Sequence, residues 1–403
     1  MLLTSLERNT CKAMRKEWIY KPLGDVCTIE RGGSPRPIEA YITDSPDGLN
    51  WIKIGDATEG SKYITSTKER IKPEGLKKSR FVHKGDFILS NSMSFGRPYI
   101  LGIDGCIHDG WLVLRDDENT FDKSYLYYVL SSPSMYREFK RLAVGGVVNN
   151  LNTKLVQSVV VAIPPRIEQQ RIVAELDLLS GIIEKQNAQL RELDTLAQSI
   201  FYDMFGNPLY NEKGWEVKLL GEVGTLQRGS GLSKKDLVEN GFPCILYGQI
   251  HTRFGAFTNH HIACIPTDLV HTAKIAHPGD VIMAITSEDV EGSCKSTAWI
   301  GGYDIAVGSD AAIFRHTLNG IYVSYYTQTQ AFFNEKSKYA HGFKVTHIST
   351  KEIATIPIPI PPHELQESFA AKMIAIDQQK ARINRAIAET QILFDYAMDK
   401  YFG

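Results

Sequence analysis

The sequence is poor in the features that place a chain in a membrane, in an oxidising compartment or among proteins that hold nucleic acid through bulk charge. Its 403 residues include six cysteines, scattered without a Cys-x-x-Cys pair, so reduced thiols are expected rather than a disulfide framework or a zinc site. No apolar run approaches the length of a membrane span, and Glu7 and Arg8 follow the short apolar start, unlike in a signal peptide. The formal net charge is −1, so any binding of nucleic acid must come from local patches. A cytoplasmic protein with no membrane contact is expected.

Motifs for catalysis are absent as well. The sequence contains neither a Gly-x-x-x-x-Gly-Lys-Ser/Thr phosphate loop nor a glycine-rich dinucleotide turn between a strand and a helix, and no nucleophile and base stand at a readable spacing. His260 and His261 precede Cys264, but no further close pair completes a four-ligand metal site, so surface histidines are the better interpretation. We therefore expect a chain with no catalytic residue, no metal and no cofactor of its own.

Two long stretches without proline dominate the sequence, Arg166–Gly206 and His363–Gly403. Each follows an Ile-Pro-Pro triplet, and each ends in Phe-Gly, where glycine suits the left-handed position after a helix. Gly181 is the single glycine inside the first stretch, and the second has none before its last residue. Each stretch of about forty residues therefore predicts one long helix, with an apolar seam of roughly 50 Å.

The apolar residues of both stretches keep the 4-3 spacing of a coiled-coil seam. Adding 197 to a position in the first seam gives its counterpart in the second. If a two-fold axis relates the halves, the helices pair antiparallel and Gly403 finishes near the start of the first domain. The alternative is a pair of ordinary amphipathic helices in a helical domain. The seam positions are Ile172, Leu176, Leu179, Ile183, Leu190 and Leu193 in the first helix, and Ile376, Ile383, Ile387 and Phe394 in the second.

The offset of 197 extends beyond the helices, so that the whole half-chain is repeated. Trp18 corresponds to Trp215, and Thr153 corresponds to Thr350. The ends of the two halves match best, while their middles diverge. Similar frames with unlike loops predict two different ligands on one type of scaffold. Residues 1–15 have no counterpart in the second half and are expected to be a leader of no importance.

Each half is expected to begin with an α+β region of roughly 145 residues built from short, mainly antiparallel strands. Strands are expected at 26–30, 51–54, 86–89 and 111–114, and at 223–227, 243–247, 280–285 and 311–314. One helix near 125–142, or 322–339, closes each region, and a last strand at 158–163, or 352–358, leads into the long helix. The expected architecture is two mainly β domains, 1–165 and 207–362, separated by long helices at 166–206 and 363–403 that form an antiparallel coiled coil with a pseudo-two-fold internal repeat.

Nucleic-acid contacts are predicted in three kinds of segment. The stretch 61–84 holds eight Lys or Arg against two Glu and suits phosphates; a solvated basic loop is the alternative. The loops at 31–36 and 228–235 carry basic and hydroxyl side chains, and the turns at 90–97 and 286–295 suit base edges in a major groove; polar turns with no role are the alternative. The candidate DNA-binding residues are Arg31, Ser34, Arg36, Lys77, Lys78, Arg80, Asn91, Arg97, Arg228, Ser230, Lys234, Lys235, Ser287 and Lys295.

These segments together resemble the specificity subunit of a type I restriction-modification system. The resemblance extends over nearly the whole chain after Trp18 and includes the two long helices that end in Phe-Gly. At the start of the second long helix the chain departs from the pattern, and only Gln366 is kept, so no partner contact is assigned there residue by residue. The motifs that carry the resemblance are Leu23-Gly24-Asp25-Val26, Arg31-Gly32, Lys84-Gly85-Asp86 and Ile163-Pro164-Pro165-Arg166-Ile167-Glu168-Gln169-Gln170-Arg171-Ile172-Val173.

The resemblance implies that each globular domain is a target-recognition domain that reads one half of a split, asymmetric site in double-stranded DNA. It implies that the paired helices set the gap between the half-sites and dock two methyltransferase (modification) subunits, which carry S-adenosylmethionine and methylate adenine. Restriction/translocase subunits that use ATP with Mg would join the full complex in a prokaryotic cytoplasm, and this chain itself would be non-catalytic. The near-neutral net charge is in tension with DNA binding, which a clamp of partner subunits around the DNA would relieve.

Two alternatives stay open at the level of the sequence. The specificity subunit of a type II-like system, with a fused methylase and nuclease, would have the same sequence features, and only its partner chain would differ. A non-DNA coiled-coil scaffold with two protein-binding heads would show no DNA affinity. Neither the target sequence nor the gap length follows from one chain.

Overall fold

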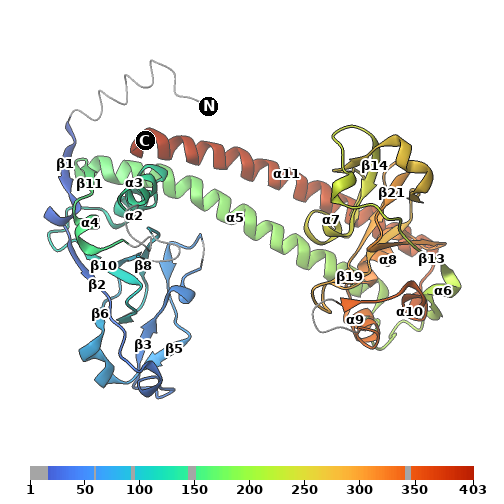
Figure 1. The fold of residues 1–403 in the computed structure, drawn as a ribbon, viewed down its shortest axis with the longest axis horizontal. Helices are drawn as coiled ribbons and strands as arrows, with labels where there is room; N and C mark the ends of the chain where they lie inside the picture. Colours follow the sequence, from blue (N-terminus) through green and yellow to red (C-terminus); the bar gives the residue numbers. More distant parts are fainter. Residues whose placement is uncertain (1–16, 59, 92–95, 144–150, 341–345) are drawn as a thin grey trace. The chain divides into compact units, whose positions relative to one another are not determined.

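The computed structural model describes residues 17–403 except 59, 92–95, 144–150 and 341–345, so the expected leader at 1–15 lies outside the described residues. The chain divides into two compact units, each drawn in Figure 1 with its own sheets and helices. The first unit comprises residues 1–187 with 385–403, and the second comprises 188–384. Each unit therefore combines one globular region with one end of each long helix. Within the described ranges, no helix is long and apolar enough to cross a membrane.

The globular region of the first unit contains two main sheets. The five-stranded sheet has the order β2 (Thr28–Arg31), β10 (Trp111–Arg115), β7 (Phe87–Ser90), β8 (Pro98–Leu101), β4 (Tyr63–Ile64). The four-stranded sheet has the order β5 (Glu69–Ile71), β3 (Leu49–Ile52), β9 (Gly105–Ile107), β6 (Arg80–Val82). A short pair, β1 (Ile19–Pro22) with β11 (Val160–Ile163), completes the strands. The helices of the region are α2 (Lys123–Ser131), α3 (Pro133–Ala143) and α4 (Thr153–Gln157), and the long helix α5 (Arg166–Phe205) follows.

The second unit repeats both sheets strand for strand. Its five-stranded sheet has the order β13 (Gly224–Arg228), β22 (Ala311–His316), β18 (Val281–Ala284), β20 (Ser296–Trp299), β15 (Phe257–Thr258). Its four-stranded sheet has the order β16 (Cys264–Ile265), β14 (Phe242–Ile245), β21 (Ile305–Val307), β17 (Lys274–Ala276). The pairs β12 (Glu216–Leu219) with β24 (Pro357–Ile360) and β19 (Thr286–Ser287) with β23 (Thr346–His347) complete the strands. The helices are α6 (Leu220–Val223), α7 (Tyr247–Thr252), α8 (Gly320–Tyr326), α9 (Gln330–Ser337), α10 (Thr350–Ala354) and the long α11 (His363–Phe402).

The predicted α+β class with mainly antiparallel strands and an internal repeat is confirmed. Among the described strands, the parallel pairs are β3–β9 and β4–β8 in the first unit, and β14–β21 and β15–β20 in the second. These exceptions fall at equivalent places, so the repeat that the sequence predicts is a repeat of topology as well as of motifs.

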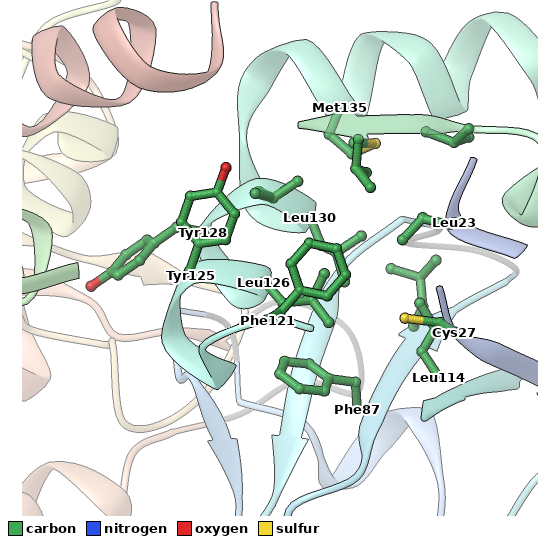
Figure 2. Packing of buried hydrophobic residues seen from close by; sticks show 14 of the residues in the cluster. Leu23, Cys27, Phe87, Leu114, Phe121, Tyr125, Leu126, Tyr128, Leu130 and Met135 are labelled. Carbon is green, nitrogen blue, oxygen red and sulfur yellow. The ribbon is translucent and has the colours of Figure 1, made fainter. Parts of the chain in front are cut away.

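The five-stranded sheet of the first unit is covered on both faces. Successive residues of a strand point to opposite faces, so Phe87 and Leu89 of β7 join the cluster with α2, α3 and α4, whereas Ile88 joins the cluster with the four-stranded sheet. Figure 2 shows the first of these clusters, in which side chains of α2 meet Phe87 and Leu114 of the sheet. Because both faces are buried, the central strands are continuous apolar runs rather than alternating ones.

The single helix expected near 125–142 is wrong, because the segment forms two helices, α2 and α3. Pro133 begins α3, and proline has no backbone N–H with which to continue the preceding helix. The helix expected near 322–339 is likewise divided into α8 and α9, and Thr329 Oγ1 accepts from Phe332 N to cap α9. The apolar pattern continues across both breaks, which is why periodicity alone did not find them.

The last strand of the second region is also displaced from its predicted position. The sequence places it at 352–358, but it lies at 357–360, and α10 occupies residues 350–354. Ser349 N donates to Glu352 Oε2 at 2.8 Å, and Glu352 N donates to Ser349 Oγ at 3.3 Å. This reciprocal capping box stabilises a helix start and outweighs the β-branched residues that suggested a strand.

A buried glutamine ties the start of α5 to the first globular region. Gln169 Nε2 donates to Pro164 O at 2.9 Å and to Thr120 O at 3.1 Å, and its Oε1 accepts from Asp122 N at 2.6 Å. Asp122 is itself the N-cap of α2. One side chain therefore joins the proline stop, the long helix and the helix that covers the sheet.

Gln366 does the same at the start of α11. Its Nε2 donates to Pro361 O at 2.8 Å, and its Oε1 accepts from Asn319 N at 2.8 Å. Asn319 is the N-cap of α8. Gln366 is 1% exposed, so the one motif residue kept in the second copy has an internal role.

The long helices run antiparallel within each unit. In the first unit, Arg171 Nη1 near the start of α5 donates to Tyr401 Oη near the end of α11 at 3.2 Å. In the second unit, Lys380 of α11 pairs with Asp194 of α5. The ring of Phe402 packs 5.8 Å from that of Tyr125 between centroids. The chain therefore finishes against the first globular region, as predicted.

All of the predicted seam positions are buried or half-buried. Ile172 and Leu176 belong to the core cluster of the first unit, where Leu179 and Phe394 pack against it. Leu193 and Ile376 belong to the core cluster of the second unit, where Ile383 packs against it. The remaining positions, toward the middle of the helices, are half-buried: Ile183, Leu190 and Ile387.

Candidate nucleic-acid interface

Three segments of the first unit meet at one end of the five-stranded sheet: the loop after β2, the tip that joins β7 to β8, and the turn before β10. Their meeting point is Asp109. Arg31 Nε and Asn91 Nδ2 each donate to the carbonyl oxygen of Asp109, both at 3.0 Å. Ser34 Oγ donates to Asp109 Oδ1 at 2.8 Å. Loops that are far apart in the sequence are thereby held together as one surface.

The charges at this meeting point are partly neutralised. Arg36 Nη2 lies 3.7 Å from Asp109 Oδ2, and His108 Nε2 lies 3.0 Å from Asp109 Oδ1. Burial opposes ionisation of Asp109, but the hydrogen bond from Ser34 and the charges of His108, Arg31 and Arg36 outweigh it and lower the pKa of the carboxyl group. Burial lowers the pKa of His108. The turn therefore holds an ionised carboxylate, while the side chain of Arg36 remains 82% exposed.

A cleft of about 850 Å³ opens beside this turn. Its lining includes Ser34, Arg36, Trp51, Lys53 and His108. Hydroxyl and guanidinium groups of this kind suit phosphate oxygens and base edges, whereas the ammonium group of Lys53 pairs with Glu69, which also lines the cleft. The predicted residues Ser34 and Arg36 are thus brought to the same cavity, whereas Trp51, Lys53 and His108 were not predicted as part of it.

The second unit repeats the arrangement with different side chains. Arg228, the counterpart of Arg31, donates from Nε to Ser309 O at 2.7 Å, and its Nη2 lies 3.6 Å from Asp310 Oδ1. Ile285 N, at the start of the second tip, donates to Asp310 O at 3.0 Å. The loop after β13, the tip after β18 and the turn before β22 therefore meet as their counterparts do.

The other predicted residues of the second unit divide into exposed and occupied ones. Lys234 and Lys235 are exposed on a short 3-10 turn. Ser230 Oγ donates to a carbonyl of β21 at 3.3 Å, and Ser287 is 9% exposed. Lys295 is exposed, but its Nζ donates to a carbonyl of α7 at 2.9 Å. Lys234 and Lys235 are the best placed of the five to meet phosphates.

The basic stretch of the first unit is not uniform. Lys77 and Lys78 are exposed at the end of the 3-10 helix Pro73–Lys78. This helix adjoins the loop after β2, because a Cβ on Gly33 would lie 2.8 Å from Lys78 O. Arg80 instead pairs with Glu30 at 3.1 Å. Lys77 and Lys78 are therefore placed for phosphates, while the charge of Arg80 is used inside the domain.

The two predicted base-reading residues of the first tip differ in their exposure. Asn91 is 1% exposed, and its amide anchors the turn at Asp109, so the side chain is not placed to reach a base. Arg97 is exposed at the start of β8, and residues 92–95 lie outside the described residues. A polar residue after a strand suggests a surface tip, but here its amide donates to a main-chain carbonyl of another loop.

The Gly-Asp motif that contributes to the resemblance has a structural role. Asp86 Oδ2 accepts from Arg115 Nε at 3.1 Å, and Asp280 Oδ2 accepts from Arg315 Nη2 at 2.8 Å. The glycine before each aspartate has a φ of +94° or +96°, a conformation that glycine adopts without steric cost. The motif therefore holds the turn before β7 or β18 against the neighbouring inner strand, β10 or β22, rather than a ligand, and its occurrence in both halves is the signal that could have shown this.

Comparisons with known proteins agree with this internal repeat. A family model described as the type I restriction modification DNA specificity domain matches the chain twice, at residues 15–193 and 212–390. The chain is similar to the type I restriction enzyme MjaVIII specificity subunit of Methanocaldococcus jannaschii, with 22% identity over 390 residues that cover 90% of this chain and 86% of that protein. It is also similar to the type I restriction enzyme EcoKI specificity subunit of Escherichia coli, with 23% identity over 183 residues that cover 43% of this chain and 39% of that protein.

Two solved structures share the fold. A chain from a study of complex assembly and conformational transition of the type I R-M system superposes with a TM-score of 0.58 and 21% identity, covering 96% of this chain and 98% of that one. The S subunit of the type I restriction-modification system from M. genitalium superposes with a TM-score of 0.54 and 14% identity, covering 96% of each chain. At these identities the likeness concerns the fold alone.

Two matched copies of one specificity domain, each with three loops gathered at the end of a sheet, define a protein that recognises DNA sequence. The chain belongs to the family of type I restriction-modification DNA specificity subunits. Its role is DNA sequence specificity, and the type II-like and non-DNA scaffold alternatives are not favoured, because the matched relatives are type I specificity subunits.

Proposed function

We propose that each globular region reads one half of a bipartite, asymmetric site in double-stranded DNA, and that the chain itself is non-catalytic. One observation carries the proposal: both regions have the same strand order and gather the same three loops, but with different side chains on them. Arg31 and Arg228 brace the loops at equivalent places, whereas the tips differ in length and composition. A shared frame with unlike tips is what two half-sites of unlike sequence require.

Phosphate contacts are proposed for the exposed lysines beside these loops. Lys77 and Lys78 flank the loop after β2, and Lys234 and Lys235 lie in the loop after β13. Contacts of this kind position a protein on the duplex without reading its sequence. Because the net charge is −1, a small number of such contacts would set the salt dependence of binding.

The long helices are proposed to set the gap between the half-sites and to dock two methyltransferase subunits. Each unit leaves apolar side chains exposed on its helices. Leu178 and Ile392 are 65% and 61% exposed in the first unit, and Leu196 and Tyr202 are 46% and 41% exposed in the second. These exposed apolar side chains are groups that a docked subunit would cover. S-adenosylmethionine would belong to the methyltransferase subunits, and ATP with Mg would belong to restriction/translocase subunits.

Duplication of one half tests the bipartite reading. In the variant, residues 207–403 are replaced by a second copy of 10–206, and the chain is co-expressed with its modification subunit. Sequencing of methylated adenines should then show a palindrome of the first half-site, because both recognition regions would be identical.

The reciprocal chain provides the matched control. Replacing residues 10–206 by a second copy of 207–403 should yield a palindrome of the second half-site. If the first variant keeps the original second half-site, the regions do not read separate halves and the proposal is wrong. Loss of all sequence preference in both variants, with the complexes intact, would contradict it equally.

A further inference from the structure

The tip between β7 and β8 in the first unit closes in the same way as the tip between β18 and β20 in the second. Gly96 N donates to Ser90 O at 2.7 Å, and Cys294 N donates to Ala284 O at 2.8 Å. Gly96 therefore corresponds to Cys294. Both have a left-handed backbone, with φ of +79° and +58°.

The second tip needs outside support to keep this conformation. Glycine adopts a positive φ freely, but a residue with a Cβ does so rarely and at a cost. Cys294 is also fully buried, while Glu288 and Asp289 at the tip are exposed. Contacts from outside the tip therefore help to hold this shape, together with the tip's own hydrogen bonds, such as that from Gly292 N to Asp289 Oδ1 at 2.7 Å.

The support comes from equivalent positions, 139 and 336, on the helix packed behind each tip. In the first unit a Cβ on Gly96 would lie 3.0 Å from Cδ2 of Phe139, which is fully buried. In the second unit Lys336 of α9 donates from Nζ to Glu291 O at 2.8 Å and to Ser293 O. An apolar contact behind one tip is thus replaced by an ammonium group behind the other.

Burying the ammonium group of Lys336 costs free energy unless the group makes favourable contacts. The residue is 4% exposed, and burial lowers its pKa. An apolar side chain fills the same position without that cost, as Phe139 shows. The contacts of the ammonium group with two main-chain carbonyls of the tip are what a hydrocarbon could not provide.

We propose that Lys336 is a positioning residue for recognition of the second half-site, because it fixes residues 286–295 in the conformation that meets DNA. Phe139 is its counterpart in the first unit, where it lies beside Gly96. At the two ends of the second tip, Lys295 Nζ donates to His251 O at 2.9 Å, and the ring of His251 lies 3.2 Å from Thr286 O. The tip is therefore held by two helices, α9 and α7. This inference rests on the proposed function, since it requires the tips to face DNA.

The test is Lys336→Met in the full chain, co-expressed with the modification subunit. Methionine keeps most of the length and the apolar stem but removes the ammonium group. Sequencing of methylated adenines should show that the preference for the second half-site is weakened by roughly 10–100-fold. A change of this size corresponds to the loss of one or two base contacts. The other half-site and the thermal midpoint of the protein should not change. Lys336→Arg keeps the charge and several donors, so it should recover most of the preference.

Two further variants serve as matched controls. Lys338→Met removes the same charge next to α9, where Lys338 pairs with Glu335 at 2.6 Å, and should affect neither half-site. Phe139→Leu should weaken the preference for the first half-site, which Lys336→Met leaves unchanged.

Full preference for both half-sites in a folded Lys336→Met chain would overturn the positioning role. Equal weakening of both half-sites, together with a lower thermal midpoint, would also overturn it in favour of general stabilisation. If the unaltered chain itself shows no half-site preference, the proposed function fails instead, so the two failures are distinguishable.

Discussion

Gln366→Leu should lower the free energy of unfolding of the second unit by about 2–6 kcal/mol. Leucine and glutamine have similar volumes, so a cavity is not expected to contribute. The change leaves two main-chain groups without their partner, the N–H of Asn319 and the carbonyl of Pro361. A buried polar group without a partner costs about 1–3 kcal/mol, and the side chain that satisfies both is 1% exposed.

Thermal unfolding followed by calorimetry provides the measurement. For a unit of this size, a loss of about 3 kcal/mol corresponds to a fall of roughly 6–12 °C in Tm. Gln169→Leu should lower the transition of the first unit instead, and by at least as much, because Gln169 makes three such bonds. The pair of variants therefore assigns each transition to its unit.

Glu367→Gln is the surface control for this prediction. Glu367 Oε1 accepts from Asn319 Nδ2 at 3.0 Å on the exposed side of the same cap, and its replacement should change stability by less than about 0.5 kcal/mol. If Gln366→Leu also changes the stability by less than about 0.5 kcal/mol, the hydrogen bonds of Gln366 do not stabilise the second unit, and the prediction is refuted.

Three more outcomes are expected. Leu176→Asp places a carboxylate in a fully buried seam position and should lower the free energy of unfolding of the first unit by several kcal/mol. A urea midpoint equal to that of the unaltered chain would show that the seam does not stabilise this unit. Lys77→Ala with Lys78→Ala should lower the slope of log affinity against log salt by roughly two, while Arg80→Ala, whose charge is paired internally, should leave it unchanged; a fall in slope with Arg80→Ala alone would contradict this assignment. Burial lowers the pKa of His316 from 6.5 to about 4, so between these values the unfolded chain binds more protons and stability falls with falling pH, by about 3 kcal/mol at pH 4. His316→Phe should abolish that part of the pH dependence, and an unchanged profile would show that another group is responsible.

The features that could be read from the sequence are those with a local or repeating physical cause. The seam from Ile172 onward follows heptad spacing, which any helix of that composition would turn to one side. Gly206 has a φ of +75° after α5, as expected of glycine at a helix end. The breaks at Pro133 and Thr329 were missed, because the apolar pattern extends across them and caps depend on single hydrogen bonds.

The candidate interface was predicted less completely than the fold. Arg31 and Arg228 lie at the gathered loops, as their equivalent positions in the repeat suggested. Asn91 and Arg80 have the right chemistry, but their groups are used by internal partners. The residue type and its position in a loop indicate what a side chain can bind. They do not indicate whether its polar group already bonds to another loop of the same domain.

The sequence by itself determined the two long helices, the duplicated α+β plan and the assignment to a DNA-specificity family, because periodicity, proline and glycine positions and a repeated chain offset act locally or repeat. Only the tertiary structure decided that Asp109 gathers three loops and that Gln169 and Gln366 face inward. It also decided that Lys336 stands behind one tip where Phe139 stands behind the other. These pairings join residues tens of positions apart in the sequence, and the hydrogen bonds that define them form only once the sheets have placed their loops within about 3 Å of one another.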